Sequence, residues 1–587
     1  MVMKNKKKYQ DIIKFIGIIA LLVVVNFVAS KKYVRLDLTA DKRFTLTDAT
    51  VNLVSDLDDV VEFKVYLTGD NLPAKFVEFK EQVRSRLEEF RNLNPDNIEY
   101  EFIDPYAVEN HEDFIRELTK KGLIYTNVSE KTENGTNQVY IVPGVMVYYK
   151  GKNYPVNFLN TEITANHIEV LNKSIQSLEH NLTTAIRILK KSKKDYKVVG
   201  FLQGHGELDG RYINDLANSL SDYYMAGPVM LADTNGKVQL NALDGVDALV
   251  IAKPRNQEDL NAINNIKRQY FSAAENIDDK MLSEEEKFVI DQFIMRGGVT
   301  VWMIDQVKAE MDSLRVTNIF PAMINKLNTE EMLYNYGVRI NNNLVEDAIC
   351  APITMQVGKY GNKPDYKQVQ WVYFPMITTN NEHITTTNLD PIKLNFANTI
   401  DTIPTTGTNK TILLTTSENC KIVKAPVRVG FDVAINGADK SFNQGKKPVA
   451  VLLEGTFNSY FKNRIPPFAN VVGKNESKTT KMLVISDGDI AKNEFAKGQP
   501  LPLGADMENR LYFDNKKFML NAFNYLLGDE DIIQARSKKI QMRLLNRALV
   551  HEKGNQIKAV NIAVPLAFIV IFGLLYNAFR TRKYARK

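Results

Sequence analysis

The residues of this chain best suited by type and spacing to chemistry are Gly204-His205-Gly206-Glu207, which directly follow the apolar run KVVGFLQ. The run predicts a strand, and ligands of open α/β sheets bind beyond the carboxyl ends of strands. Glycines let the backbone approach a ligand or adopt positive φ, and His205 and Glu207 can act as acid, base or ligand. The alternative is a tight turn whose side chains hydrogen-bond neighbouring loops. The segment therefore predicts either a ligand or partner contact or a structural turn.

Acidic residues follow two further predicted strands. Asp487 and Asp489 lie in the turn after KMLVI, and Asp305 ends the run VTVWMI. Three carboxylates at one sheet edge could form a cation site. Acidic residues at strand ends also cap the helices that follow, and capping is their commoner role. We expect these residues to face the first turn across the sheet edge.

The familiar catalytic motifs are absent from the sequence. It contains no Gly-x-Ser-x-Gly, P-loop, His-Glu-x-x-His or Gly-x-Gly-x-x-Gly pattern, so it carries no ATPase signature. Two cysteines exclude a disulfide scaffold and a four-cysteine zinc site, and the six histidines are scattered. We therefore predict a protein that is not an enzyme and has neither cofactor nor metal. Any energy it uses must come from a partner.

Two apolar segments with basic flanks lie near the ends of the 587-residue chain. The first, 12–30, predicts an uncleaved transmembrane anchor, with a cleaved signal peptide as the alternative. The second, 559–579, has 21 residues without a charge and is followed at once by basic residues. Basic clusters outside both segments predict cytoplasmic termini and a large domain on the other side of the membrane. The mild net charge of +6 fits this topology and does not suggest nucleic acid as a partner.

The sequence between these segments predicts two α/β units. The first has a strand at Val60–Gly69, a helix at Ala74–Leu93 and a strand at Ile98–Asp104, which implies a parallel pair with a right-handed crossover. Its outline is thioredoxin-like, but the absence of Cys-x-x-Cys excludes thiol–disulfide chemistry. An amphipathic helix at about 164–191 is expected to pack this unit on the second.

The second unit is expected to be a doubly wound sheet with helices on both faces. Continuous apolar strands at Ala248–Lys253 and Val299–Ile304 alternate with helices, one of which begins with a capping box at Ser283. A stretch rich in Asn, Thr and β-branched residues predicts a β-rich insertion. The α/β pattern resumes at 449–455 and 481–489, which should complete the sheet begun at Lys197.

These patterns divide the chain into predicted parts: an N-terminal transmembrane anchor (12–30), a first extracytoplasmic α/β domain (31–163), a connector helix (164–194), a second α/β domain (195–530) with a β-rich insertion (about 316–447), a membrane-proximal helix (531–558) and a C-terminal transmembrane helix (559–579).

Several motifs occur together in a characteristic order: YEFIDP, FLQGHGE, SEEEKFVIDQFIMRGGVTVWMIDQV, LEGTF and KMLVISDGD. In this combination the chain resembles the GldG family, the gliding-motility-associated ABC transporter auxiliary (nominally substrate-binding) proteins of Bacteroidetes. The resemblance implies an inner-membrane complex with an ATPase and a permease subunit. It also implies a central domain similar to the GIFT domain, which is related to class I glutamine amidotransferases. The amidotransferase nucleophile has no counterpart, because Cys350 and Cys420 lie in the insertion, and this argues against catalysis.

The predicted function is that of a non-enzymatic periplasmic subunit of an ABC transporter associated with gliding motility. It would couple the permease to a periplasmic partner or substrate. The expected partners are the ATPase and permease subunits, membrane lipid, and a periplasmic protein or glycan. Two alternatives remain open: a solute-binding receptor of the transporter and, less favoured, a membrane-anchored hydrolase or amidotransferase-like enzyme working from Gly204–Glu207.

Overall fold

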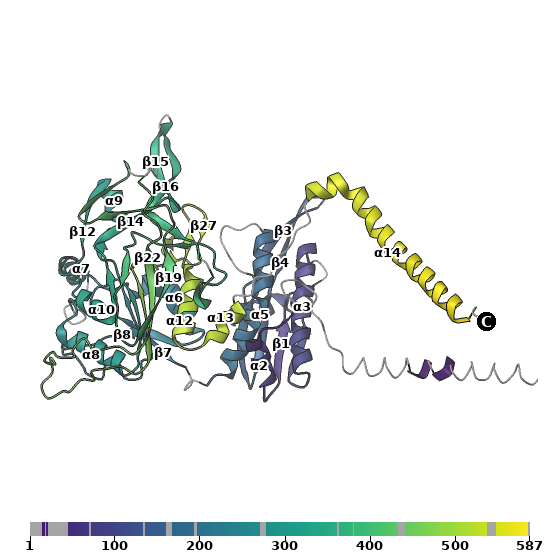
Figure 1. Cartoon of the computed structure of the whole chain (residues 1–587), viewed down its shortest axis with the longest axis horizontal. Helices are drawn as coiled ribbons and strands as arrows, with labels where there is room; N and C mark the ends of the chain where they lie inside the picture. The colour runs from purple at the N-terminus through teal and green to yellow at the C-terminus, as the bar shows by residue number, and fades with distance from the viewer. Residues whose placement is uncertain are drawn as a thin grey trace, which may run out of the picture. The chain divides into compact units, whose positions relative to one another are not determined.

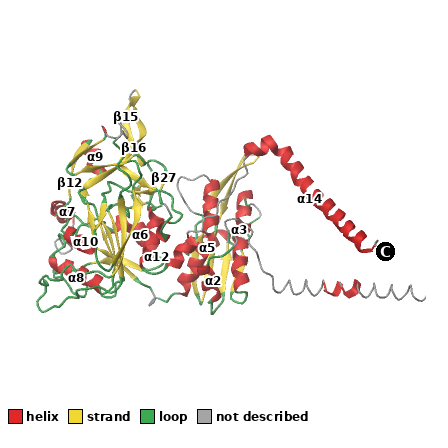
Figure 2. Cartoon of the chain, viewed as in Figure 1, coloured by secondary structure: helices red, strands yellow, loops and turns green. Residues whose placement is uncertain are grey.

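The computed structural model describes residues 15–17, 19–21, 45–69, 72–132, 135–159, 167–192, 196–270, 278–360, 363–379, 381–432, 441–536 and 547–584. The chain forms two compact units, Met1–Lys539 and Ile540–Lys587. The α/β class predicted from the sequence is confirmed, with strands lying between helices in the larger unit (Figures 1 and 2).

The N-terminal part of the larger unit is built on a four-stranded sheet. Strands β1 (Val61–Val65) and β2 (Ile98–Phe102) pair in parallel and are joined by α3 (Ala74–Leu93), as predicted. The sheet has the order β2-β1-β5-β6, and its last two strands are antiparallel. The remaining elements of this part are α2 (Asp48–Ser55), α4 (His111–Lys120), β3 (Thr126–Thr132), β4 (Gly135–Ile141), β5 (Gly144–Tyr149), β6 (Lys152–Asn157) and α5 (His167–Lys190).

Helix α5 covers the same face of this sheet as α3. Its apolar residues Leu178, Leu182 and Ile186 are fully buried in a core with Phe63 and Phe90. Three- and four-residue spacing of apolar side chains produces this single buried stripe. The helix also contacts the part of the unit that follows it, because the Tyr223 hydroxyl lies 3.3 Å from Nε2 of His180. The connector predicted from the sequence thus packs mainly in the first core.

The rest of the larger unit is organised around a seven-stranded sheet of order β19-β22-β23-β10-β9-β7-β8. The five strands from β23 to β8 are parallel, and β22 and β19 add antiparallel pairs at one edge. The resumed α/β pattern therefore completes this sheet, as predicted. The strands are β7 (Val198–Leu202), β8 (Met225–Val229), β9 (Ala248–Ala252), β10 (Val299–Met303), β19 (Thr408–Thr415), β22 (Pro448–Gly455) and β23 (Thr480–Ile485).

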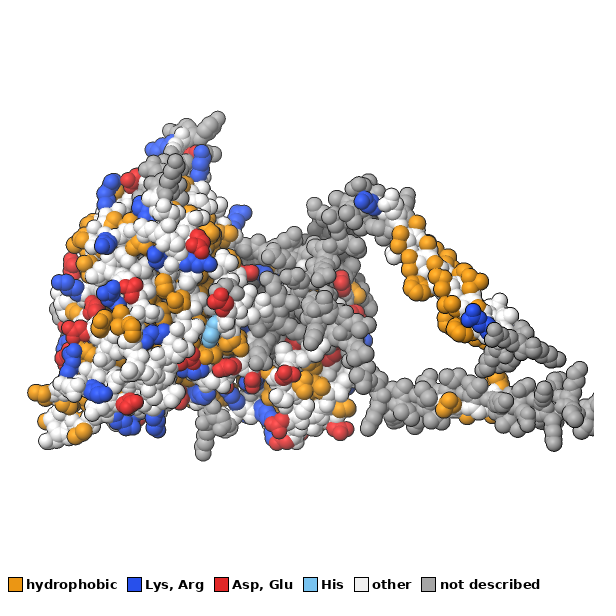
Figure 3. Space-filling view, in the orientation of Figure 1, with side chains coloured by type: hydrophobic (Ala, Val, Ile, Leu, Met, Phe, Trp, Pro, Cys, Tyr) orange, Lys and Arg blue, Asp and Glu red, His pale blue; other side chains and the backbone are white. Residues whose placement is uncertain are grey.

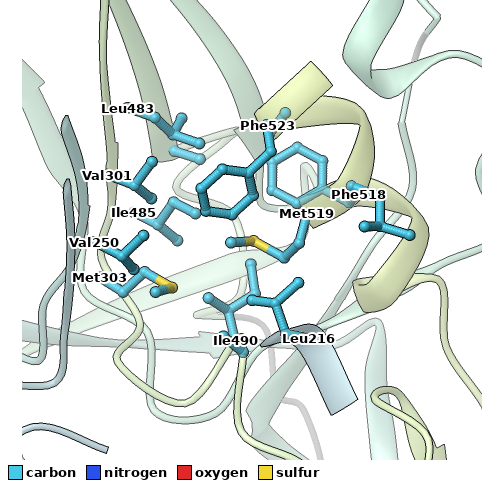
Figure 4. Close-up of a cluster of buried hydrophobic side chains, with 14 of the residues drawn as sticks. Leu216, Val250, Val301, Met303, Leu483, Ile485, Ile490, Phe518, Met519 and Phe523 are labelled. Atoms are coloured by element: carbon cyan, nitrogen blue, oxygen red, sulfur yellow. The ribbon is translucent and has the colours of Figure 1, made fainter. Parts of the chain in front are cut away.

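Helices bury both faces of this sheet. On one face, Leu216, Phe518 and Phe523 pack against Val250 and Val301, as Figure 4 shows. Because side chains alternate along a strand, the neighbouring residues face the opposite core, which contains helix residues such as Phe288 and Ile294. This two-sided burial explains the continuous apolar strands. The helices of the first face are α6 (Gly210–Ser221) and α12 (Asn515–Leu526), and those of the second are α8 (Glu284–Met295) and α10 (Glu330–Tyr336).

The predicted β-rich stretch folds as short antiparallel pairs beside the sheet. Its longest pair is the β15–β16 hairpin, and β19 leaves the stretch to pair with β22 as an edge strand of the main sheet. The other strands near it are β11 (Val307–Lys308), β12 (Ile319–Ile324), β13 (Val338–Ile340), β14 (Asn343–Asp347), β15 (Cys350–Tyr360), β16 (Lys363–Ile377), β17 (Ile392–Lys393), β18 (Ile400–Thr402), β20 (Cys420–Lys424) and β21 (Val427–Gly430).

The remaining elements of the larger unit are α7 (Gln257–Tyr270), α9 (Met311–Thr317), η2 (Ile384–Thr386), β24 (Phe495–Ala496), β25 (Gln499–Pro500), β26 (Ala505–Asp506), β27 (Leu511–Tyr512) and α13 (Glu530–Arg536).

The smaller unit consists of α14 (Arg547–Tyr584). Within it, Lys558–Arg582 spans 25 residues and is apolar enough to cross a membrane; it is the one such helix among the described residues. Figure 3 shows hydrophobic side chains along the middle of the helix and basic side chains near both ends. Only 15–17 and 19–21 of the predicted N-terminal span are described, and they are helical. The rest of that span, and 537–546 of the predicted membrane-proximal helix, lie outside the described residues.

Candidate functional site

The strand order reverses between β7 and β9. The two candidate turns, one after β7 and one after β23, lie at the carboxyl edge of this sheet. The chain leaves β7 to form β8 on one side and returns to form β9 on the other. A crevice at such a switch point is where ligands bind in open α/β sheets. Gly204 follows the carboxyl end of β7 by two residues, and Lys253 directly follows β9. The edge predicted from the sequence is therefore the natural place to look for a site.

His205 is buried between two glutamates. Its Nδ1 lies 2.9 Å from Oε1 of Glu207, and its Nε2 lies 3.2 Å from Oε1 of Glu286. Burial alone lowers the pKa of the imidazole, but the hydrogen bonds and charges of the two carboxylates outweigh it and raise the pKa of His205 to about 10. His205 is consequently a fixed cation near neutral pH and not a general base poised to exchange a proton.

The two glycines of this turn allow the adjacent loop to pack closely. Both have positive φ, and a Cβ on Gly206 would lie 2.6 Å from Cγ of Arg255. The Arg255 amide donates a 2.9 Å hydrogen bond to the His205 carbonyl. The crevice between β7 and β9 is thus occupied by the protein's own residues. Glu286 also belongs to the predicted capping box at Ser283, which the structure confirms.

The carboxyl ends of β9, β10 and β23 meet at the ammonium group of Lys253. Its Nζ lies 2.6 Å from Oδ2 of Asp489 and 3.1 Å from Oδ2 of Asp305, and Glu310 is 3.7 Å away. The Lys253 side chain is only 4% exposed. Two of the three predicted acidic residues are thus brought together, and a lysine supplies the cation between them.

Electrostatics hold Lys253 and Asp489 of this cluster in their charged forms. Burial lowers the pKa of Lys253, but the surrounding carboxylates outweigh that effect and raise it. Burial raises the pKa of Asp489, yet Lys253 and Lys492 bring it down to about 2. Desolvation keeps the pKa of Asp305 raised. Lys253 and Asp489 therefore form a buried ion pair. Removing either partner would leave an uncompensated charge in the interior.

Asp487 makes a different set of contacts. Its Oδ2 accepts a 2.7 Å hydrogen bond from the backbone N–H of Asn395, and its Oδ1 accepts one of 2.7 Å from the backbone N–H of Asp489. Nearby, the Asn398 amide donates to the Ser486 carbonyl at 3.0 Å. The bonds from Asn395 and Asn398 attach the β-rich insertion to the end of β23. The third predicted acidic residue therefore contacts the insertion, which covers this part of the sheet edge.

Lys253 and the asparagines of the insertion were not singled out from the sequence. Lys253 has a φ of 56°, an uncommon value for a residue with a side chain, and it is buried. A lysine directly after a wholly apolar strand was an available signal. A Cβ on Gly488 would lie 2.8 Å from both Cβ and Cγ of Lys253, so the glycine is required for this packing.

An open cleft of about 890 Å³ lies next to the ion cluster, and Glu310 and Asp489 form part of its wall. It runs between the β15–β16 side of the insertion and the segment that follows β23. The segment supplies Phe495 and Asn509, and α6 supplies Tyr212. The cleft mixes aromatic, amide and charged side chains, and its volume is within the range of small-molecule sites, roughly 300–1,000 Å³. His205 does not line it.

Nucleophilic and metal chemistry find little support in the described residues. Both thiols are buried, and burial raises the pKa of Cys420 and raises that of Cys350 to about 12. Among the residues that the structure describes, no group of three or more His, Cys, Asp or Glu side chains is arranged to hold a metal ion.

One comparison with known proteins supports a transport-associated role. Residues 259–522 match the family model described as an ABC-type uncharacterized transport system, and residues 40–148 match a model described as a domain of unknown function. The first match supports an auxiliary protein of an ABC transporter. The comparison with curated proteins found no match.

A nucleoside-diphosphate sugar epimerase from Corynebacterium glutamicum is among the solved structures found, with 13% sequence identity and a TM-score of 0.13. The similarity covers 30% of this chain and 35% of the epimerase chain. At that TM-score it carries no argument about fold or function.

Proposed function

We propose that the protein is a non-enzymatic, membrane-anchored subunit of an ABC transport complex of the gliding-motility type. Its α/β body lies on the periplasmic side of the inner membrane and couples the permease to a periplasmic partner or substrate. The match of residues 259–522 to the ABC-type transport family carries this proposal, because it includes four of the seven strands of the central sheet and every lining residue of the cleft except Tyr212.

The membrane anchoring is supported by the apolar helix Lys558–Arg582. Basic residues follow its apolar stretch at once, which by the positive-inside rule favours a cytoplasmic C-terminus. The basic residues before 12–30 favour a cytoplasmic N-terminus in the same way. We infer two spans on this basis, with the folded body between them on the far side of the membrane.

The non-enzymatic assignment is supported by how the charged groups of the sheet edge are used. His205 is held between Glu207 and Glu286, and Lys253 is held between Asp305 and Asp489. A catalytic acid or base needs a pKa near the working pH and access to a substrate. These buried ion pairs have neither, and their arrangement fits a structural role that shapes the cleft beside them.

Purification from native membranes in mild detergent tests this proposal. A tagged full-length chain should bring down an ABC ATPase and a multi-span permease in fixed ratio, and a chain truncated before Arg547 should lose both. Recovery of the full-length chain without either subunit would contradict the proposal. A replacement in the cleft, such as Phe495→Ala, should leave this recovery unchanged, because the contact is assigned to the membrane helices.

A further inference from the structure

The cleft beside the ion cluster has walls that are held together by hydrogen bonds. The side-chain Nδ2 of Asn509 donates a 2.9 Å hydrogen bond to the Pro352 carbonyl, and the Thr354 hydroxyl donates one of 3.0 Å to Oδ1 of Asn509. These bonds join the segment after β23 to the first residues of β15. A cleft formed in advance costs a ligand little ordering free energy on binding.

Aromatic and methionine side chains form the accessible apolar part of the cleft. Phe495 is 38% exposed and packs edge-to-face on Tyr212, with ring centroids 5.4 Å apart. Met507 is 40% exposed, and Phe431 lines the cleft with partial exposure. Exposed rings held in fixed orientations provide flat surfaces on which the C–H faces of a ligand can stack.

The cationic side chains of the cleft are already paired with carboxylates. Arg315 lies 3.2 Å from Glu508, and Lys393 lies 3.2 Å from Asp506. The third, Lys492, has its Nζ 3.7 Å from Oδ1 of Asp489. Six carboxylate side chains line the cleft against these three cations. An anionic ligand would therefore meet a net negative surface whose cations are engaged, so phosphate and carboxylate ligands are disfavoured.

Two buried acceptor atoms of the cleft have spare hydrogen-bonding capacity. Oδ1 of Asn395 and Oδ1 of Asp489 are buried without a hydrogen-bond partner, and both residues line the cleft. The 3.7 Å from Oδ1 of Asp489 to Nζ of Lys492 is an ion-pair contact that is too long for a hydrogen bond. Buried acceptors in this state need a donor, from water or from a ligand. A small cavity of about 30 Å³ adjoins them and is large enough for water. A matching ligand must therefore supply hydrogen-bond donors.

Hydroxyl groups satisfy these conditions better than ammonium groups. A polycation would place its charges beside Lys393, Lys492 and Arg315, and like charges in close contact are unfavourable. A hydroxyl can donate to the carboxylates and amides and can also accept from the lysines. A ligand rich in hydroxyls with apolar C–H faces would use both the polar and the aromatic walls.

We propose that this cleft binds an uncharged saccharide chain, with its sugar faces against Phe495 and Tyr212 and its hydroxyls on the carboxylate and amide groups. The inference deepens the proposed function, because it names the periplasmic substrate class that the subunit holds. The inference rests on the proposed function only for the periplasmic location, where the cleft would encounter a saccharide.

Titration calorimetry of the detergent-solubilised full-length chain tests this inference. The probes are uncharged tetrasaccharides of glucose in β1,4 and α1,4 linkage, of mannose and of N-acetylglucosamine. A tetragalacturonate and a tetralysine peptide serve as the charged comparisons. At least one uncharged tetrasaccharide should bind, and Phe495→Ala and Glu494→Gln should each weaken it about tenfold, as expected for loss of one stacking or hydrogen-bonding partner. Tyr366→Ala, which removes a 61% exposed ring outside the cleft, should leave the affinity unchanged.

Three results would overturn the inference: no binding of any uncharged tetrasaccharide, stronger binding of either charged probe, or equal loss in the Tyr366→Ala control. None of these depends on the ATPase or permease. Failure of saccharide binding with intact co-purification would remove the ligand assignment alone. Failure of co-purification would remove the proposed function, whatever the titration shows.

Discussion

The Nζ atom of Lys253 lies 2.6 Å from Oδ2 of Asp489, although 236 positions separate the two residues in the chain. This contact joins the loop after β9 to the turn after β23. With Asp305 at the end of β10, it draws three neighbouring strand ends to one buried ammonium group. Asp305 and Asp489, which the sequence suggested as ligands of a cation, bind the ammonium group of Lys253 instead. Their role is to hold together the strand ends beside the cleft.

Replacement of Lys253 by methionine should destabilise the protein strongly. It leaves Asp305 and Asp489 buried without their cation, and breaking a buried pair in this way costs about 3–5 kcal/mol. Thermal melting of the full-length chain in detergent should show a large drop. Lys326→Met, at an exposed position, should change it little. Adding Asp489→Asn to Lys253→Met should recover part of the loss, because one unpaired charge is removed. Equal melting of the single and double variants would argue against the pair.

His205 should make the stability depend on pH on the alkaline side. Its pKa rises from 6.5 to about 10 on folding, so its contribution is complete below about pH 6.5 and is lost as the pH rises through about 10. The difference in melting temperature between the natural chain and His205→Gln should therefore be large near neutrality and shrink toward pH 10. A difference that does not change with pH would show that the imidazole is uncharged in the folded protein.

Gly488→Ala should disturb the ion cluster from the backbone side. The new methyl group would lie 2.8 Å from Cβ and Cγ of Lys253 and 3.1 Å from Cγ of Asp305, distances that force the neighbours to move. Gly210→Ala is the matched control, because no atom lies within 4 Å of its added methyl group. We expect Gly488→Ala to lower the melting temperature. Gly210→Ala should leave the melting temperature unchanged or raise it slightly. Similar values for both would contradict the packing described here.

Ser283→Ala should cost about 1 kcal/mol, the usual value for loss of an N-cap side chain. The Ser283 hydroxyl accepts a 3.2 Å hydrogen bond from the Glu286 amide and donates one of 2.8 Å to the Glu286 carboxylate. Because Glu286 also holds His205, the loss should be larger at neutral pH than at pH 10. A melting temperature identical to that of the natural chain at both pH values would exclude the capping box as a stabilising element.

The order of strands and helices was predictable because each element has a local signal. The strand Ala248–Ala252 is an unbroken apolar run, and the helix after Ser283 begins with three glutamates. Such patterns depend only on neighbours in the chain. The same signals placed Gly204–Glu207 and Asp489 at the carboxyl edge of one sheet, and the structure agrees.

The partners of the edge residues were not predictable in the same way. Lys253 meets Asp489 only because β9, β10 and β23 become neighbours, and this depends on the packing of the whole domain. The cleft depends further on Asn395 and Asn509, which come from separate segments with no local pattern. Contacts between residues far apart in the chain, and a cleft wall built from separate segments, leave no periodic pattern in a single sequence.

Photo-cross-linking from α14 in native membranes tests the central claim most directly. A benzophenone side chain placed in turn at Phe568, Ile569, Val570 and Ile571, which follow one another at about 100° around the axis, samples all faces of the apolar helix. The same group at the exposed Ile266 of α7 is the control. We predict a cross-link to a multi-span ABC permease from at least one helix position and none from Ile266. Cross-links to lipid or to a second copy of this chain alone, from all four positions, would contradict the account.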